Sequence, residues 1–416
     1  MSEGRVVAPL TPRRPWQGRK ILLGVTGGIA AYKSVQIARD LSQLGASVDV
    51  ILTSAAREFV GAITFEAVIG HPVHTDLIAP GSALDHIKLA RSCDLLCVAP
   101  ATADLLARAA AGRADDLLTA VLLATKAPVL ICPAMNDAMW QHPQVQLNAA
   151  HLRDVLGYHL VGPAVGALAY GEGAGAGRME EGSVIVEYIG RALESDAALR
   201  GKRIVVTAGP TREPVDPVRV LSNRSSGRMG YALAAAAWRR GADVTLISGP
   251  AALPEPVGAT VQRVETADEM TAAVRNAIAG ADALIMAAAV ADFRPAAPAS
   301  SKIKKNAAIS AIELEPAPDV LKSTRADRAQ QLRVIGFALE TDAHEDNARK
   351  KLAEKGLDFI VLNDATEPGA GFEVSTNKVT IIHKDSTSAE QLPLLSKDDV
   401  ADAILDRLGQ LFSAQA

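Results

Sequence analysis

Aromatic residues and cysteines are scarce in this chain of 416 residues. Only 4% of the residues are aromatic while 49% are hydrophobic, so the core must be built from Ala, Val, Leu and Ile, as is usual for parallel α/β sheets. The three cysteines, Cys93, Cys97 and Cys132, lie in apolar surroundings and lack the paired spacing of metal ligands. We expect them to be small buried side chains, and we expect no disulfide framework.

The sequence also lacks long apolar runs and an excess of positive charge. No apolar run reaches the roughly 18 residues of a membrane span, so we expect none. The net charge of −4 argues against a nucleic-acid partner held through its phosphates. Residues 1–17 carry prolines among basic residues but no apolar core of a signal peptide. We therefore expect a disordered tail on a cytoplasmic protein.

Two similar units follow one another along the chain. A strand, a Gly-containing turn, a helix and a second strand begin at Gly18, and the same order begins again at Gly201. This repetition predicts an α/β fold with two doubly wound, Rossmann-like domains. The expected parts are a tail over residues 1–17, a first domain over residues 18–190, a linker over residues 191–200 and a second domain over residues 201–416.

The first unit has one clear helical pattern and one segment without any period. A helix is expected over residues 30–44. Its core-facing residues are expected to be Tyr32, Val35, Ala38 and Leu41. Residues 162–179 are rich in glycine and show neither helix nor strand periodicity. They are expected to form a mobile loop that serves as a linker or a lid.

Residues 203–231, RIVVTAGPTREPVDPVRVLSNRSSGRMGY, are the most informative segment. A β-branched strand leads into a polar loop, and a helix is expected from Met229 to Arg239. Free backbone N–H groups and the helix dipole favour a phosphate at such a helix start, and arginine adds forked hydrogen bonds to phosphate or carboxylate. The segment therefore predicts an anion site, with a solvated loop over a sheet edge as the alternative.

Polar residues also follow several strands of the first unit. Gly27 and Gly28 stand in a turn after the first strand. Thr53, Thr102 and Asn136 follow later strands. Because the carboxyl ends of parallel strands meet at one edge of a sheet, we expect a ligand there.

The segment 203–231 resembles the signature of phosphopantothenate–cysteine ligases, which is close to TAGPTREPLDPVR followed by SNxSSGxMG. Further resemblance runs from about residue 18 to residue 365 and points to the bacterial bifunctional enzymes that fuse this ligase to phosphopantothenoylcysteine decarboxylase. The resemblance implies an enzyme of coenzyme A biosynthesis. It would join 4′-phosphopantothenate to cysteine in its second domain and decarboxylate the product to 4′-phosphopantetheine in its first.

In the first domain, the runs GVTGGIAAYK, APATAD and PAMN resemble flavin-containing cysteine decarboxylases. The resemblance implies a flavodoxin-like domain that binds FMN at the subunit contacts of a trimer. The implied FMN-binding residues are Gly27, Gly28, Thr53 and Thr102. Asn136 would hold the departing carboxylate, and His86 would orient the substrate or move its thiol proton. FMN would oxidise the thiol to a thioaldehyde, which lets CO2 leave, and would later return the hydride.

The first domain departs from the decarboxylase pattern in its glycine-rich segment. The family's lid commonly reads ACGxxGxGR, and its cysteine is implicated in reducing the enethiol intermediate. Tyr170 stands in that place here, so the resemblance implies it as a third catalytic residue of the first domain beside His86 and Asn136. A phenol can donate a proton but cannot carry out thiol redox chemistry. A milder departure is Asp115, where an asparagine is usual. We expect oxidation and CO2 loss to persist while the final reduction is impaired.

In the second domain, the resemblance implies a dimeric ligase that uses CTP and Mg²⁺ and forms an acyl-CMP intermediate. Asn223 matches the residue tied to that intermediate, and Arg219 matches the one near the cysteine-addition step. Asp292 would also contact Mg²⁺. The implied nucleotide-binding residues are Met286, Ala287, Ala288, Asp292, Lys302, Pro318, Asp319, Val320, Leu321, Phe337, Lys351 and Lys355. Residue chemistry alone does not separate CTP from ATP.

Three alternatives stay open at this point. The protein could be a ligase whose flavin domain, impaired by Tyr170, serves as an oligomerisation module. It could be a flavin-binding regulatory protein, although the intact ligase signature argues against that. A plain NAD(P)-dependent reductase is a third hypothesis, but the chain lacks GxGxxG with an acidic residue about 20 positions later.

Overall fold

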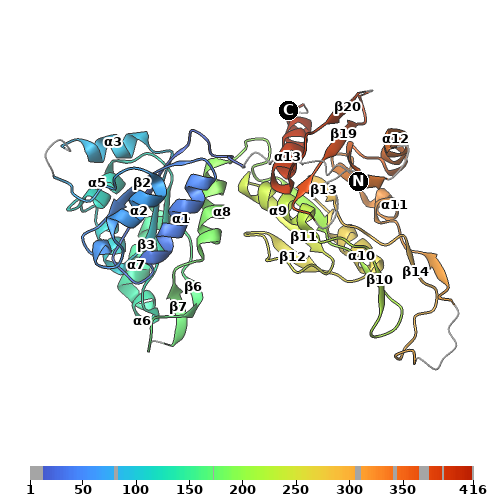
Figure 1. Cartoon of the computed structure of the whole chain (residues 1–416), viewed down its shortest axis with the longest axis horizontal. Coiled ribbons are helices and arrows are strands. Elements are labelled where there is room, and N and C mark those ends of the chain that lie inside the picture. The colour runs from blue at the N-terminus through green and yellow to red at the C-terminus, as the bar shows by residue number, and fades with distance from the viewer. Residues whose placement is uncertain are drawn as a thin grey trace, which may run out of the picture. The chain divides into compact units, whose positions relative to one another are not determined.

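The computed structural model describes residues 13–78, 83–171, 173–304, 311–340, 344–364, 374–386 and 388–414. The chain divides into two compact units, one within Pro12–Glu194 and the other within Ser195–Ala416 (Figure 1). Each unit is built on a mainly parallel sheet covered by helices, which confirms the predicted doubly wound α/β class. Among the described residues, no helix has both the length and the apolar character needed to span a membrane.

The first unit contains a five-stranded parallel sheet with the order β2-β1-β3-β4-β5. Its strands are β1 (Lys20–Val25), β2 (Ser47–Leu52), β3 (Leu95–Ala101), β4 (Val129–Pro133) and β5 (His159–Leu160). A hairpin of β6 (Ala164–Ala167) and β7 (Ala174–Arg178) lies outside this sheet. The helices are α1 (Ala31–Gln43), η1 (Ala56–Glu58), α2 (Ala62–Ile69), α3 (Asp85–Ser92), α4 (Ala103–Ala110), α5 (Leu117–Ala124), α6 (Asp137–Gln141), α7 (Pro143–Asp154) and α8 (Gly182–Leu193).

Successive side chains of the buried strands point into two different apolar cores, one on each face of the sheet. Ile21 and Leu23 of β1 belong to the core under α1, α2 and α8, whereas Leu22 belongs to the core under α3, α4, α5 and α7. Because successive side chains of a strand point to opposite faces, both faces of the sheet must be covered. Cys97 and Cys132 are buried in the first of these cores, as predicted, while Cys93 is only half-buried.

Three expectations for the first unit need correction. Tyr32 was expected on the core face of α1, but it is 60% exposed, and the residues that α1 buries are Ala31, Ser34, Ile37, Ala38 and Leu41. The disordered tail was expected to reach residue 17, yet Trp16 is only 2% exposed and its Nε1 donates to Glu194 Oε1 at 2.7 Å. Residues 1–12 of that tail lie outside the described residues. The predicted loop over residues 162–179 contains the β6–β7 hairpin.

The second unit contains an eight-stranded sheet with the order β12-β11-β8-β13-β16-β17-β19-β20. Its strands are β8 (Arg203–Ala208), β11 (Asp243–Ser248), β12 (Thr260–Arg263), β13 (Ala283–Met286), β16 (Arg333–Glu340), β17 (Phe359–Asp364), β19 (Val379–His383) and β20 (Ala389–Gln391). Pairing is parallel from β12 to β17 and antiparallel at β19 and β20. Three small ladders pair β9 (Arg212–Pro214) with β10 (Val220–Ser222), β14 (Phe293–Pro295) with β15 (Leu314–Pro316), and β18 (Thr376–Asn377) with β21 (Leu395–Ser396).

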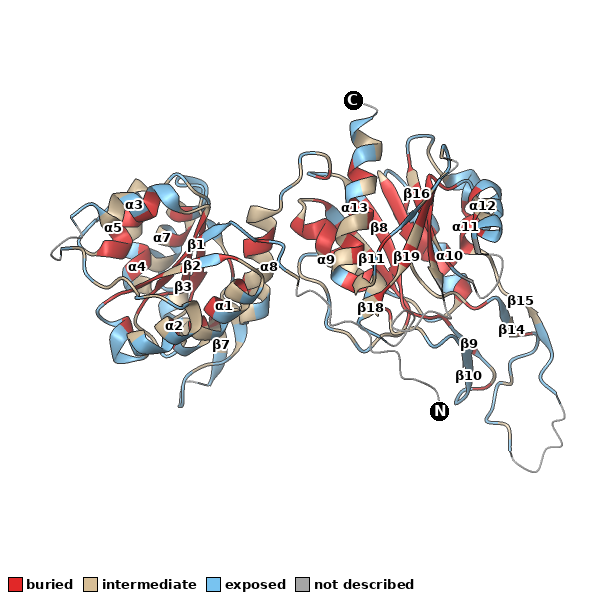
Figure 2. Cartoon of the chain, turned by 45° about the horizontal axis from the view of Figure 1, so that its top comes forward, coloured by how far each residue is buried: buried red, intermediate tan, exposed pale blue. Residues whose placement is uncertain are grey.

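Helices cover the central strands of this sheet (Figure 2). They are α9 (Arg228–Arg239), α10 (Ala267–Ala277), α11 (Val320–Ser323), η2 (Arg325–Asp327), α12 (His344–Lys355) and α13 (Lys397–Ser413). Met270 of α10, Leu321 of α11 and Leu352 of α12 belong to one buried core with strand residues such as Ile360. Helices α9 and α13 pack against each other, and α9 also packs on β8 and β11. The start of α13 lies near the start of α9, because Lys397 is close enough to Arg228 to feel its charge, while Arg240 at the other end of α9 pairs with Asp402 and Asp406 of α13.

Candidate functional sites

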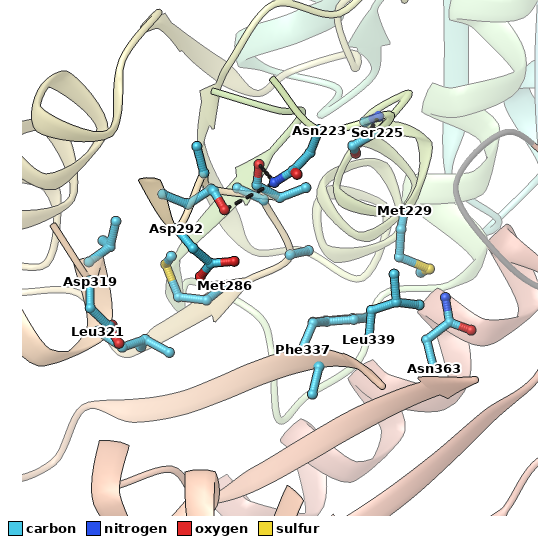
Figure 3. A pocket seen from close by; sticks show the side chains of 18 of the residues that line it. Asn223, Ser225, Met229, Met286, Asp292, Asp319, Leu321, Phe337, Leu339 and Asn363 are labelled. Carbon is cyan, nitrogen blue, oxygen red and sulfur yellow. Dashed lines mark hydrogen bonds between the residues drawn. The ribbon is translucent and has the colours of Figure 1, made fainter. Parts of the chain in front are cut away.

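A pocket of about 410 Å³ lies at the carboxyl edge of the sheet in the second unit (Figure 3). It lies among the residues that follow β13, the ends of β16 and β17, and the starts of α9, α11 and α13. The predicted residues that it brings together are Asn223, Met286, Ala287, Ala288, Asp292, Pro318, Asp319, Val320, Leu321, Phe337, Lys351 and Lys355. Segments far apart in the sequence thus meet where a doubly wound fold binds its ligand.

The polar loop ends in a helix start that faces this pocket. Gly227 adopts a left-handed conformation (φ 78°) before α9, and no side chain caps that helix. Gly230 lets α9 approach β8 closely, because a Cβ at this position would lie 2.5 Å from Ala208 Cβ. Ser225, Ser226, Gly227, Arg228 and Met229 all line the pocket. The helix start therefore presents backbone N–H groups and a positive dipole end to a ligand.

Asn223 connects the polar loop to the segment after β13. Its Nδ2 donates to the carbonyl oxygens of Ala289 and Val290, at 3.2 and 3.1 Å (Figure 3). Both of these residues line the pocket. Asn223 thus fixes two walls of the pocket relative to each other, which requires an amide N–H that a carboxylate does not have.

Arg219 and Lys302 are not among the residues that line this pocket. Arg219 Nε donates to Asp216 Oδ2 at 2.9 Å, and its Nη2 donates to the carbonyl oxygen of Ile303 at 2.7 Å. Burial of the Asp216 carboxylate raises its pKa, but hydrogen bonds from Arg219, Val218 and Ile303 outweigh this and hold the pKa well below the ordinary range. Arg219 therefore anchors the segment that contains Lys302, whose side chain is exposed.

Acidic and basic residues share the other end of the pocket. Lys355 Nζ lies 3.1 Å from Asp319 Oδ2, and Lys351 precedes it by one helical turn of α12. Burial raises the pKa of Asp319, while the Lys322 N–H group and Lys355 lower it by more, so the carboxylate stays charged. Asp292 lies exposed on the pocket wall. Across the described residues, no three His, Cys, Asp or Glu side chains gather into a metal site.

Several pocket residues were not predicted from the sequence. Asn363, Asn377 and Lys397 line the pocket beside Arg228 and Met229. Lys397 begins α13 in the run Ser396-Lys-Asp-Asp, where Ser396 Oγ accepts from Asp399 N. This run indicates a helix start. It gives no sign that the lysine points to a ligand pocket, because that position depends on the packing of α13 against α9.

The first unit has a pocket of about 540 Å³ at the carboxyl edge of its sheet. Gly27, Gly28, Thr102 and Asn136 line it, together with Lys33 and Arg178. A Cβ on Gly28 would meet no atom within 4 Å, whereas a Cβ on Gly27 would lie 2.4 Å from Ala55 Cβ. Gly27 is therefore required by packing, while Gly28 leaves open space in the pocket.

Two threonines and one asparagine shape this edge through hydrogen bonds. Thr102 Oγ1 accepts from Leu105 N and caps α4, and Asn136 Oδ1 accepts from Ala138 N and caps α6. Thr53 is buried, its Oγ1 accepts from Ala56 N at 3.2 Å, and it does not line the pocket. Thr53 therefore supports the turn after β2, and a direct contact with a cofactor is not indicated for it.

His86 does not line the pocket that contains Asn136. It lies in α3 and lines a separate pocket of about 590 Å³, with Ile78, Leu123 and other apolar residues. Its Nδ1 is buried and has no hydrogen-bond partner among the described residues. His86 and Asn136, two of the catalytic residues predicted for the first unit, thus line different pockets of one chain.

Tyr170 lies in the connection between β6 and β7 and is fully exposed. The preceding residues Ala167, Leu168 and Ala169 line the Asn136 pocket. The other strand of the hairpin is fixed beside that pocket, because Met135 N donates to Gly177 O at 2.9 Å. Tyr170 is therefore carried by a segment that borders the pocket without contributing to its wall.

Asp115 belongs to a cluster of charges before α5. Its carboxylate pairs with Arg108 at 3.0 Å and with Arg113 at 2.7 Å. The hydrogen bond from Arg108 lowers the pKa of Asp115, so this carboxylate is charged at neutral pH. In place of the amide usual in the family, the chain has a surface ion pair at this position.

Comparisons with known proteins cover both units. The Flavoprotein family model matches residues 10–194, and the model for the DNA/pantothenate metabolism flavoprotein C-terminal domain matches residues 199–411. The coenzyme A biosynthesis bifunctional protein CoaBC of Vibrio cholerae is 45% identical over 392 residues, which cover 93% of this chain and 97% of that protein. The protein of the same name from Bacillus subtilis is 46% identical over 398 residues, covering 94% and 97%. A crystal structure of the C-terminal domain of CoaBC is 42% identical, covers 53% of this chain and 100% of that chain, and has a TM-score of 0.45.

Proposed function

This chain belongs to the family of bifunctional coenzyme A biosynthesis proteins, and on that basis we propose how its two units divide the work. Residues 201–416 join 4′-phosphopantothenate to cysteine with CTP, through an acyl-CMP intermediate. Residues 18–190 then decarboxylate phosphopantothenoylcysteine to 4′-phosphopantetheine with FMN. Residues 191–200 link the two. The cytoplasmic location expected from the sequence stays a prediction.

The pocket of the second unit carries the ligase proposal, because its composition suits two anionic substrates. The uncapped start of α9 lies at one end, and Lys351 and Lys355 lie toward the other. A helix start and a pair of lysines both favour a bound phosphate. Asn223 holds the wall between them through Ala289 and Val290. The acyl-nucleotide forms where the two substrates meet, and negative charge develops there. A wall held in place between the two phosphate sites is therefore the arrangement that this intermediate needs.

The direct test uses purified full-length protein with CTP, cysteine and 4′-phosphopantothenate, analysed by mass spectrometry. Phosphopantothenoylcysteine should form, and with FMN bound it should be converted further with loss of CO2. ATP in place of CTP tests the nucleotide base. Absence of the amide product with either nucleotide would refute the ligase assignment.

We propose that Mg²⁺ reaches the ligase pocket together with the nucleotide. Asp292 supplies one carboxylate to the pocket wall, and Asp319 is already engaged by Lys355. Mg²⁺ commonly uses one or two carboxylates and completes its shell with phosphate oxygens and water. The residues present therefore fit an ion carried by a nucleotide better than an ion held by the protein alone.

The pocket of the first unit fits FMN in three respects. Gly28 leaves open space, and α1 begins beside it without a side-chain cap. Lys33 and Arg178 line the pocket and share one carboxylate, that of Glu181, which leaves one net positive charge for a phosphate. FMN supplies the oxidation of the substrate thiol and the later return of hydride. Asn136 lines the same pocket and can hold the substrate carboxylate through its amide N–H, because its Oδ1 is used in capping α6.

The placement of His86 supports an oligomer in which one copy completes the site of another. His86 lines a pocket bordered by the exposed apolar side chains of Ile78 and Leu123. The Asn136 pocket is bordered by exposed Ile29 and Tyr32. Exposed apolar side chains around the His86 pocket and the Asn136 pocket are expected if subunits meet at both surfaces. We propose a trimer of flavin units that brings His86 of one copy to Asn136 of another.

A similar argument applies to the ligase unit. Val218 and Val220 flank Arg219 and are exposed, as are Phe293 and Leu314 of the β14–β15 ladder. These exposed apolar residues suit a dimer contact. We propose that the dimer brings Arg219 and Lys302 to the pocket of the partner subunit, because they do not line the pocket of their own chain.

The flavin site predicts a sharp difference between two glycine substitutions. Gly28→Val should fill the open space of the pocket without a backbone clash, so FMN content should fall about 10- to 100-fold. Gly61→Val is the matched control, since Gly61 has ordinary extended backbone and does not line the pocket. FMN released on denaturation is the measurement. A wild-type protein that cannot be reconstituted with FMN would refute the decarboxylase proposal.

Tyr170 predicts an incomplete decarboxylase cycle. The wild-type protein should oxidise and decarboxylate its substrate but release the oxidised aminoenethiol product, because a phenol cannot supply the thiol chemistry of the family's lid. Tyr170→Cys should raise the ratio of 4′-phosphopantetheine to aminoenethiol, measured by mass spectrometry. Tyr170→Phe is the control that removes only the hydroxyl. If the wild type gives only reduced product and Tyr170→Phe reduces its yield, the phenol itself donates the proton.

A further inference from the structure

Lys397 is a charged residue that the ligase assignment leaves without a role. It is the first residue of α13 and lines the pocket, yet it is only 6% exposed. Burial and the nearby charge of Arg228 lower the pKa of Lys397 to about 8. Two cationic side chains are thus close together at one part of the pocket wall.

The charges along the pocket are unevenly distributed. Figure 3 shows Asp319 and Leu321 at one end and Met229 and Asn363 at the other. The acidic residues among the described lining residues are Asp292 and Asp319, and Lys355 pairs with Asp319. Arg228 immediately precedes Met229, so the end near Met229 has two cations and the start of α9. This end favours a negatively charged ligand group.

We propose that Lys397, together with Arg228 and the first backbone N–H groups of α9, binds a phosphate group of a ligase substrate. This subsite is separate from the one formed by Lys351 and Lys355, and the proposal rests on the ligase function given above. The ammonium of Lys397 adds a charge-assisted hydrogen bond to a phosphate that the helix start already attracts. The C-terminal helix α13 thereby becomes part of the substrate site.

Asn363 provides a second group at the same end. Its Oδ1 is buried and has no hydrogen-bond partner within the described part of the chain. A buried acceptor of this kind is costly unless a ligand donates to it. A substrate whose phosphate lies at Lys397 can place a hydroxyl or amide group at Asn363 and donate to its Oδ1.

Two ligase substrates carry the required chemistry. One is the 4′-phosphate monoester of phosphopantothenate, and the other is the polyphosphate of the nucleotide. Binding measured separately for each substrate distinguishes them. Calorimetry on the full-length protein should use CTP with Mg²⁺, 4′-phosphopantothenate, and pantothenate as the analogue that lacks the phosphate.

Lys397→Gln should weaken binding of one phosphate-bearing substrate about 10- to 100-fold, the effect of losing a hydrogen bond to a charged group. A loss confined to 4′-phosphopantothenate identifies the monoester, and a loss confined to CTP identifies the polyphosphate. Lys397→Arg should restore most of the affinity because it keeps the charge. Lys350→Gln is the matched control, because Lys350 is exposed on α12 and does not line the pocket.

Unchanged affinities of both substrates in Lys397→Gln would overturn the proposal. An equal loss for CTP, phosphopantothenate and pantothenate that Lys397→Arg does not reverse would also overturn it, since that result indicates packing alone. Lys397→Met, which keeps a similar length, replaces the glutamine variant if the latter does not fold. Failure of the wild-type protein to form the amide would refute the ligase function itself, which is a different result.

Discussion

Decarboxylase activity should reappear when two inactive variants are co-expressed in one cell. His86→Asn removes the ring from one surface of the flavin unit. Asn136→Asp keeps the oxygen that caps α6 but removes the amide N–H of a residue that lines the proposed FMN pocket. Each variant alone should be inactive in CO2 release. If a site combines His86 of one copy with Asn136 of another, random assembly leaves about a quarter of the sites intact.

Two controls make this complementation experiment specific. Two differently tagged copies of the same variant should give no activity, because no intact site can form. Amide formation from CTP, cysteine and 4′-phosphopantothenate should be unchanged in every preparation, because the ligase pocket lies in the other unit. Activity of the mixed oligomers no greater than that of the parent variants would contradict a site shared between subunits.

Local sequence patterns predicted much of the fold. The helix expected from Met229 to Arg239 coincides with α9 (Arg228–Arg239), and the strands expected before and after it lie in β8 and β11. These elements have strong intrinsic signals, namely helix-forming residues or runs of β-branched residues between turns. The face of α1 was harder to predict, because Tyr32 fits an apolar stripe by spacing alone and yet lies on the exposed side.

The glycine-rich segment shows why composition can mislead. Glycine was interpreted as a sign of mobility, but two of these glycines allow a close approach between chain segments. A Cβ on Gly175 would lie 2.6 Å from Asp137 Cβ, and one on Gly177 would lie 2.3 Å from Met135 O. The hairpin therefore packs beside the Asn136 pocket. Only the three-dimensional neighbours distinguish a flexible glycine from a packed one.

Residue chemistry alone predicted a site only where one motif supplies its residues, whereas the separate segments of the ligase pocket were assigned through the family resemblance. Asn223 and the start of α9 lie in a single loop, so sequence reasoning found them together. Lys397 is over 160 residues from Arg228, and their proximity depends on the packing of α13 against α9. His86 and Asn136 were predicted as one site, but within one chain they line different pockets. A site that needs a second subunit cannot be assembled from one chain's pattern.

Asn223→Asp should impair the ligase about 100-fold, and Asn223→Ala about 10-fold. The alanine variant loses the two hydrogen bonds to the carbonyl oxygens of Ala289 and Val290, and neutral hydrogen bonds are worth roughly 0.5–1.5 kcal/mol each. The aspartate variant loses the same bonds and also places a negative charge against these two carbonyl oxygens. It further repels an anionic acyl-nucleotide in the pocket, which accounts for the additional factor of about ten.

The two steps of ligation should respond differently to these variants. Pyrophosphate release from CTP without cysteine reports formation of the acyl-nucleotide, and amide formation with cysteine reports the complete reaction. Because Asn223 fixes the pocket wall, the defect should already be present in the first step. Unchanged FMN content confirms that the first unit is intact in each variant. An aspartate variant no slower than the alanine variant would show that charge at this position does not act on the intermediate. Wild-type rates in both variants would remove Asn223 from the ligase site.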